Sequence, residues 1–190
     1  MSLPTTEIDG LRRQSVKAWS WFEDTVSDVT AEQANWWPPG TANSIGATYL
    51  HVVINADVEI NRLIHHREPL VERRDGDVGQ GFPYDPARFD RWVRHAPVEW
   101  EQLREYGLAV HAWFVESLAE LNQAHLDEPV DMTRSGLGMW QGRDLLELHG
   151  YNHPHIHGGE VAVLKGLQGS VGWIEPEGFV QVEEYGETDD

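Results

Sequence analysis

The sequence contains no cysteine, only two lysines and no long apolar run. Without cysteine, the protein has no disulfide, no thiolate nucleophile and no cysteine-ligated zinc site. No stretch approaches the roughly 18 consecutive apolar residues that a membrane span requires. The N-terminal stretch lacks the basic segment of a signal peptide, and an amphipathic pattern follows it rather than an apolar core. We therefore expect a cytoplasmic protein.

Basic residues are scarce altogether. The 32 acidic side chains outnumber the 14 basic ones and give a formal net charge of −18. Such a charge repels phosphate backbones and anionic lipid surfaces, so we expect no nucleic acid and no membrane as partner. High solubility is the simplest interpretation of the acidic surface. The 40% hydrophobic content is ordinary, and 190 residues suit one domain with a sizeable core.

Apolar residues recur at helical spacing in four regions, at about 8–29, 43–66, 85–123 and 142–166. This pattern predicts an all-α protein, an antiparallel four-helix bundle. We expect a break or kink at Pro97 in the third region. The expected core positions are Leu11, Ser15, Ala18, Phe22 and Val26 in the first helix, Ala47, Ile54 and Val58 in the second, Leu103, Val110, Phe114, Leu118 and Leu121 in the third, and Leu145, Leu148, Val161, Leu164 and Leu167 in the last.

Long loops connect these helices, at about 68–86 and 127–140, and they allow crossovers as well as simple hairpins. We expect no strand in them. The one candidate for local strand pairing is the stretch 179–182. The C-terminal stretch is rich in glycine and glutamate. We therefore assign residues 1–169 to the bundle, and residues 170–190 to an irregular acidic tail that is packed on the bundle or frayed from it.

Ten histidines are many for this length, and His149, His153 and His157 repeat every fourth residue in the last predicted helix. At about 3.6 residues per turn, neighbouring members of this series share a helix face, so either adjacent pair can hold one ion. His51 lies within the apolar stripe of the second helix, where an unpartnered imidazole is costly to bury. Together these features favour a metal site over separate hydrogen-bonded histidines.

Pro154 disturbs the regular geometry of the histidine series, because it removes an N–H that would bond to the Gly150 carbonyl. One alternative is a kinked helix with local bulging, tolerated because Gly150 is small. The other is a helix that begins afresh at Pro154, with His153 at its cap. Either alternative still allows His153 and His157 to point inward, whereas we expect His155 to point roughly the opposite way.

Two blocks of the sequence resemble the DinB/YfiT-like superfamily. The first block, residues 36–51, contains WWPPGTANSIG followed by YLH, and the second, residues 153–161, reads HPHIHGGEV. The resemblance extends over roughly residues 8–173. It implies a DinB-like four-helix bundle, often assembled as a homodimer, with a three-histidine site for a divalent metal.

The resemblance also implies which histidines are the ligands. It selects His51, His153 and His157 and leaves His149 outside the ligand set. Imidazole ligands suit zinc, nickel, copper and iron, among which we expect zinc or nickel. The superfamily includes thiol-dependent transferases and isomerases as well as members without a known reaction, so it implies a site more firmly than a substrate.

Three neutral histidines leave an ion at least one open position, as in catalytic zinc sites. Such an ion lowers the pKa of bound water, polarises a carbonyl or binds a thiolate. We therefore expect a metal-dependent enzyme that acts on a small-molecule substrate or thiol, either a hydrolase or a low-molecular-weight-thiol transferase. The alternative is a non-catalytic ligand-binding or dimeric bundle whose metal is structural or absent.

The candidate catalytic residue is Glu160, three residues after His157, which can act as a base or orient a ligand. A surface or packing carboxylate is the plainer interpretation, and the same holds for Asp57. Arg73 and Arg74 are candidates for binding an acidic thiol, although a solvated loop pair is the simpler interpretation. Most of the nine tryptophans are expected to fill the core. Those expected near a pocket are Trp36, Trp37 and Trp140.

Overall fold

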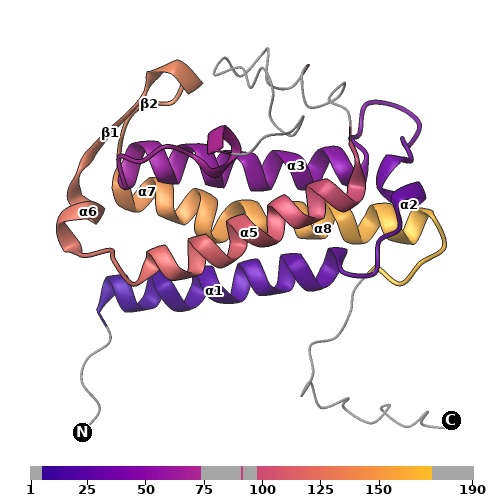
Figure 1. The fold of residues 1–190 in the computed structure, drawn as a ribbon, viewed down its shortest axis with the longest axis horizontal. Helices are drawn as coiled ribbons and strands as arrows, with labels where there is room; N and C mark the ends of the chain where they lie inside the picture. The colour runs from indigo at the N-terminus through magenta and orange to yellow at the C-terminus, as the bar shows by residue number, and fades with distance from the viewer. Residues whose placement is uncertain (1–5, 74–90, 92–97, 173–190) are drawn as a thin grey trace, which may run out of the picture.

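The computed structural model describes residues 6–73, 91 and 98–172, and most of these residues are helical. Four long helical segments lie side by side within this part of the chain (Figure 1). They are α1 (Glu7–Val26), α3 (Ile45–Asn55) continued by the π-helix η1 (Ala56–Ile64), α5 (Trp100–Leu118), and α7 (Gly142–Glu147) continued by the π-helix η4 (Leu148–Asn152) and by α8 (His153–Leu167). The short elements are α2 (Ala31–Asn35), η2 (Leu70–Arg73), α6 (Gln123–Asp127), β1 (Pro129–Met132), η3 (Thr133–Ser135) and β2 (Gly138–Gln141). The predicted all-α fold class is confirmed.

The long segments do not simply alternate in direction. α1 and the α7–α8 segment run one way, whereas α3 and α5 run the other way (Figure 1). α1 and the α7–α8 segment are therefore parallel neighbours, in which Ser15 lies against Gly150 of η4 and Phe22 lies against Gly158 of α8. Since α3 and α5 run parallel, a crossover must connect them, as the length of that connection allowed.

The predicted helices agree with the observed ones, with small shifts at their ends. The N-cap of α3 is Ser44, whose Oγ accepts a hydrogen bond from the Ala47 amide at 3.1 Å. The start predicted for the third helix lies outside the described residues, and the observed α5 begins at Trp100. All expected core residues are buried except two in the last segment: Leu148 is half-buried, and Leu167 is exposed. The prediction for Leu167 was wrong because the end of α8 borders a cavity.

A small hairpin contradicts the prediction of strand-free loops. β1 and β2 pair antiparallel, with Val130 opposite Trp140, and Gly136 turns the chain between them with a φ of 77° that glycine adopts without strain. Each strand has four residues and β1 starts with a proline, so neither gives a readable alternation in the sequence. The other predicted pairing, at 179–182, lies outside the described residues.

The last segment passes through Pro154 without restarting. Asn152 and His153 both have right-handed helical backbone, and the His153 N–H bonds to the carbonyl of Leu148, five residues earlier. This π-turn widens the helix directly before the proline ring, which relieves the clash that proline causes in a regular α-helix. Of the two alternatives, the continuous helix with a local bulge is therefore the one observed.

The bulge leaves one carbonyl that the helix itself cannot satisfy. In the π pattern, the His149 carbonyl would accept a bond from residue 154, but a proline has no N–H to donate. The indole Nε1 of Trp19 in α1 donates to this carbonyl instead, at 3.0 Å in a buried position. Gly150 permits the approach, because a side chain there would collide with Ser15 Oγ. The segment that carries the histidines is thus anchored to α1.

The boundary expected at residue 170 falls at the edge of the described chain. Ser170 still contacts the bundle, since Gln33 Nε2 donates to its Oγ at 2.6 Å, and Gly172 lies against Ala162. Residues 173–190 are not described, so the acidic tail stays a prediction. Among the helices that the structure describes, none is long and apolar enough to cross a membrane.

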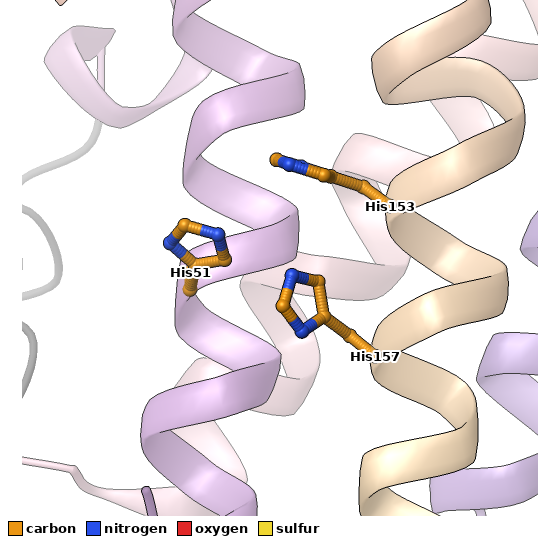
Figure 2. Close-up of side chains that lie close together, drawn as sticks. All are labelled: His51, His153 and His157. Carbon is orange, nitrogen blue, oxygen red and sulfur yellow. The ribbon is translucent and has the colours of Figure 1, made fainter.

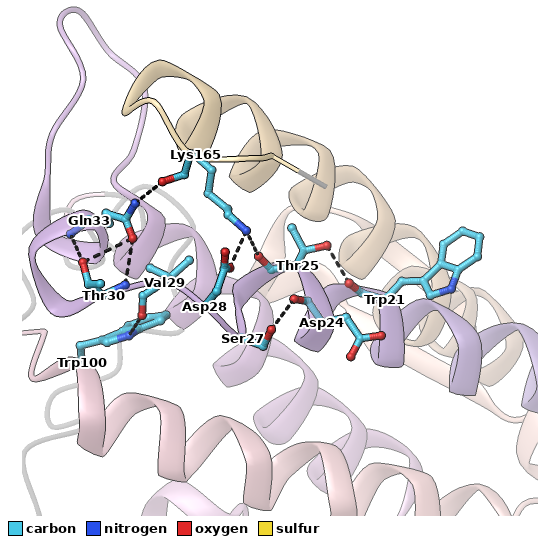
Figure 3. Close-up of polar contacts among 11 residues, drawn as sticks. Trp21, Asp24, Thr25, Ser27, Asp28, Val29, Thr30, Gln33, Trp100 and Lys165 are labelled. Atoms are coloured by element: carbon cyan, nitrogen blue, oxygen red, sulfur yellow. Dashed lines mark hydrogen bonds and ion pairs between the residues drawn. The ribbon is translucent and has the colours of Figure 1, made fainter. Parts of the chain in front are cut away.

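One of the two lysines ties α8 to the end of α1 (Figure 3). The Lys165 side chain is 0% exposed; its Nζ donates to the Thr25 carbonyl at 3.0 Å and lies 2.5 Å from Asp28 Oδ1. The carbonyls in the last turn of a helix lack hydrogen-bond partners within that helix. The ammonium group donates to one of them, and its positive charge interacts favourably with the negative end of the helix dipole. This contact helps fix the position of α8, and hence of its histidines, relative to α1.

We predict that Lys165→Met lowers the free energy of unfolding by about 2–3 kcal/mol, because it leaves a carbonyl and a carboxylate without their cation. Urea denaturation followed by circular dichroism measures the change. Lys17→Met removes the exposed lysine and serves as the control, with an expected change within about 0.5 kcal/mol. Equal effects of the two substitutions would contradict the structural role of Lys165.

Candidate metal centre

His51 of α3 faces His153 and His157 of α8 across the space between the two helices (Figure 2). One ring nitrogen from each residue can be chosen so that all three lie within 4.8 Å of one another. The ring centroids are 4.9 to 5.2 Å apart, and the three residues are half-buried. The structure thus brings together the three histidines that the resemblance selected, and they form a site that could bind a metal ion.

The surroundings keep two of these imidazoles, those of His51 and His153, uncharged. Burial lowers the pKa of His51 from 6.5 to about 3, with the neighbouring His157 and His149 adding to the shift. Burial likewise lowers the pKa of His153 to about 2, with help from His149, His51 and His157. A neutral imidazole keeps a lone pair on one nitrogen, which is the form that binds metals.

The donor set fits a divalent ion. His153 Nδ1 is buried and has no hydrogen-bond partner among the described residues, although burying such a nitrogen unpaired is costly. Three imidazole nitrogen donors suit several first-row transition metals, so the donor set does not choose between zinc and nickel. A metal bound through His153 Nδ1 would give this nitrogen the partner that the described residues do not supply.

Two polar side chains contact the outer nitrogens of the candidate ligands. Glu160 Oε2 lies 2.7 Å from His157 Nδ1, and Asn55 Nδ2 lies 3.2 Å from His51 Nδ1. A carboxylate that accepts the Nδ1–H of a histidine leaves Nε2 free for a metal and fixes the ring orientation. The Asn55 amide can do the same when its oxygen faces His51, which requires only a 180° turn of the amide group.

The sequence predicted Glu160 as the catalytic residue, either as a base or as a residue that orients a ligand. The contact between Glu160 and His157 has the geometry expected of a carboxylate that orients a metal-binding histidine. Its side chain is nevertheless 52% exposed and lines a cavity, so the role as a base stays a prediction.

A second carboxylate–histidine pair lies beside the three histidines, and sequence reasoning missed its carboxylate. His149 is buried, its Nε2 lies 2.6 Å from Glu59 Oε2, and its ring centroid is 4.9 Å from that of His153. His149 Nδ1 is buried without a hydrogen-bond partner among the described residues. Glu59 lies in η1 and His149 in η4. The presence of an acidic residue, Glu59, in the apolar second helix could have indicated a functional role. Its spacing from His51, however, does not reveal that it pairs with His149.

The other candidates have different environments. Asp57 is fully buried and accepts hydrogen bonds from the Tyr106 hydroxyl, from the Asn61 side chain and from two backbone amides of the 70–73 turn. Burial raises the pKa of this carboxyl. It holds the turn against η1, as the packing interpretation anticipated. The Arg73 side chain and Arg74 lie outside the described residues.

A cavity of about 910 Å³ lies between the loop after α2 and the C-terminal half of α8. It borders the histidine site through Glu160, which contacts His157. Of the three tryptophans expected near a pocket, Trp36 lines this cavity. Trp37 is exposed, and Trp140 packs against the core instead.

We predict that the metal-free protein loses stability as the pH falls below 6.5. The unfolded chain takes up protons on His51 and His153 near their ordinary pKa of 6.5, whereas the folded protein does not until far lower pH. The free energy of unfolding should therefore fall by about 1.4 kcal/mol per pH unit for each of these protons. Urea denaturation with a chelator, at several pH values below 6.5, measures this slope. The double variant His51→Asn/His153→Asn should show a shallower slope, and equal slopes would show that these imidazoles are not held neutral.

Comparison with known proteins agrees with this architecture. The chain is similar to a conserved protein from Enterococcus faecalis of known crystal structure, with 17% sequence identity, a TM-score of 0.62, and coverage of 86% of this chain and 98% of that one. At this identity the similarity concerns the fold. No curated protein matches the chain. The model of the DinB superfamily matches residues 14–161, and the chain therefore belongs to the DinB superfamily.

Proposed function

We propose that the protein is a metal-dependent hydrolase in which His51, His153 and His157 hold a divalent ion, with zinc or nickel as the expected metals. The observation that carries this proposal is the convergence of three ring nitrogens within 4.8 Å, beside a cavity of about 910 Å³. Metal sites with three protein ligands keep a position for water or substrate, whereas structural zinc sites are closed by four. The neighbouring cavity offers a substrate room beside the three histidines, which supports the hydrolase.

Each part of the site has a task in this proposal. A bound divalent ion supplies Lewis acidity, which lowers the pKa of water and polarises a carbonyl oxygen. The three imidazoles hold the ion without neutralising its charge. Glu160 keeps His157 in the ligating orientation through their 2.7 Å contact. The apolar side chains of the lining lower the polarity around the substrate, which strengthens the electrostatic interactions within the site.

The charges around the cavity favour hydrolysis of an uncharged substrate over transfer to an acidic thiol. The cavity lining includes one carboxylate, Glu160, and no basic side chain among the described residues. The bound ion itself attracts a thiolate, but no basic side chain of the described lining would bind the other acidic groups of such a thiol. Thiol transfer is thus the less supported of the two reactions that the sequence analysis anticipated.

We predict that the untagged protein binds about one zinc or nickel ion per chain and hydrolyses 2-naphthyl acetate, and that His153→Ala loses both properties. Elemental analysis and the fluorescence of released 2-naphthol provide the two measurements. His155→Ala is the matched control, because His155 lies on the same helix but contacts Tyr151 and Trp21 instead of the site.

Three outcomes decide between the alternatives. A wild-type protein without stoichiometric metal, even after zinc or nickel supplementation, contradicts the metalloenzyme proposal. Stoichiometric metal without turnover of ester or thiol substrates favours the non-catalytic binding protein instead. Equal metal loss in His155→Ala would show that the metal does not bind at the three histidines.

We further predict that Glu160→Gln weakens metal binding by about 10–100-fold, because the neutral amide no longer draws the Nδ1 proton of His157 toward it. Competition with a chromophoric chelator measures the affinity, and turnover is then compared at saturating metal. A loss of turnover with unchanged metal affinity would instead assign Glu160 the role of a base. If neither quantity changes, Glu160 has no part in the site.

A further inference from the structure

The cavity beside the histidines has one wall that is apolar and poorly covered. Val163 and Leu167 of α8 line it, and each is 64% exposed. Trp36 and the two prolines that follow in the loop form the opposite wall. Apolar side chains at this level of exposure favour a ligand that removes them from water. The main body of a ligand for this cavity should therefore be apolar.

Two polar side chains in the same lining lack partners. Thr48 is 1% exposed, and its Oγ1 has no hydrogen-bond partner among the described residues; the same holds for the buried Oδ1 of Asn43. A buried hydroxyl and a buried amide oxygen normally have partners, because leaving them unpaired is costly. The Asn43 oxygen accepts a hydrogen bond, and the Thr48 hydroxyl accepts or donates one. A ligand hydroxyl can donate to the Asn43 oxygen or accept from the Thr48 hydroxyl, and a ligand amide N–H can donate to either oxygen.

The position of these groups connects the cavity to the histidine site. Thr48 precedes His51 by three residues, about one helical turn in α3, and Glu160 follows His157 by the same interval in α8. A ligand bound at Thr48 therefore lies along the two helices that carry the candidate metal ligands. The Glu160 carboxylate in the lining also disfavours an anionic ligand.

We propose that this cavity binds uncharged, largely apolar molecules that carry a hydroxyl or amide N–H, and that Asn43 and Thr48 recognise this donor group. The assignment of this cavity as the substrate site of a hydrolase rests on the proposed function. Binding itself does not need the metal, because neither recognition residue is a candidate ligand.

Calorimetric titration with three aromatic probes tests the proposal on the full chain after chelator treatment, so that no bound cation attracts the anionic probe. 2-Naphthol carries a hydroxyl donor, 2-methoxynaphthalene has a similar shape without the donor, and 2-naphthoate is anionic. We expect the wild type to bind 2-naphthol about 10-fold more tightly than 2-methoxynaphthalene, and 2-naphthoate most weakly. Thr48→Val, which keeps the shape but removes the hydroxyl, should reduce or abolish the preference for 2-naphthol. Equal affinities for the two uncharged probes, or tightest binding of 2-naphthoate, would overturn the proposal.

A bulky substitution locates the bound probe. Val163→Trp should fill the cavity and weaken both uncharged probes, whereas Leu108→Trp, at an exposed apolar position of α5, should leave binding unchanged. Binding that persists unchanged in Val163→Trp would show that the probes bind elsewhere. Thermal melting of each variant establishes that it is folded, and the comparison of probes on the wild type needs no variant.

The metal proposal and the cavity proposal can fail separately. If His153→Ala keeps the preference for 2-naphthol while the wild type holds no metal, the hydrolase proposal fails and the cavity assignment stands. If the wild type holds its metal but does not distinguish the two uncharged probes, the cavity assignment fails and the metal site stands.

Discussion

The functional site depends on the antiparallel packing of α3 against α8, because this packing brings the three histidines together. Three imidazoles occupy positions in this contact that apolar side chains would otherwise fill, and burial holds at least two of them neutral. Burying neutral imidazoles between packed helices costs free energy unless their lone pairs accept a hydrogen bond or bind a metal ion. Burial therefore destabilises this part of the metal-free core and also keeps His51 and His153 in the neutral form that binds a metal. Trp19 and Lys165, which tie the last segment to α1, maintain the geometry from the opposite side.

Two π-helical stretches adjust the register of this contact. η1 begins soon after His51, and η4 ends directly before His153. A π-turn inserts an extra residue and rotates the following side chains relative to a regular helix, and such turns often occur at functional sites. Here the two stretches bring Glu59 and His149 into contact next to the three histidines. Pro154 fits the second stretch because the wide turn has room for its ring.

The parts of the structure that depend on local spacing could be predicted from the sequence. Apolar periodicity located the four helices, and the histidine spacing, together with the resemblance, located the three residues that meet between α3 and α8. The remaining features depend on which elements become neighbours. The β1–β2 hairpin has strands too short for a pattern. Leu167 is an apolar residue at the end of α8, and no helix within the described part of the chain covers it. The pairing of Glu59 with His149 arises from two π-turns that no spacing rule anticipates.

The central claim is that His51, His153 and His157 hold one divalent ion. X-ray absorption spectroscopy at the metal edge, on untagged protein loaded with zinc, tests it most directly. The account predicts a first coordination shell with three imidazole nitrogens at about 2.0–2.1 Å, and the loss of one imidazole contribution in His153→Ala. A spectrum without imidazole scattering, or one that His153→Ala leaves unchanged, would contradict the account.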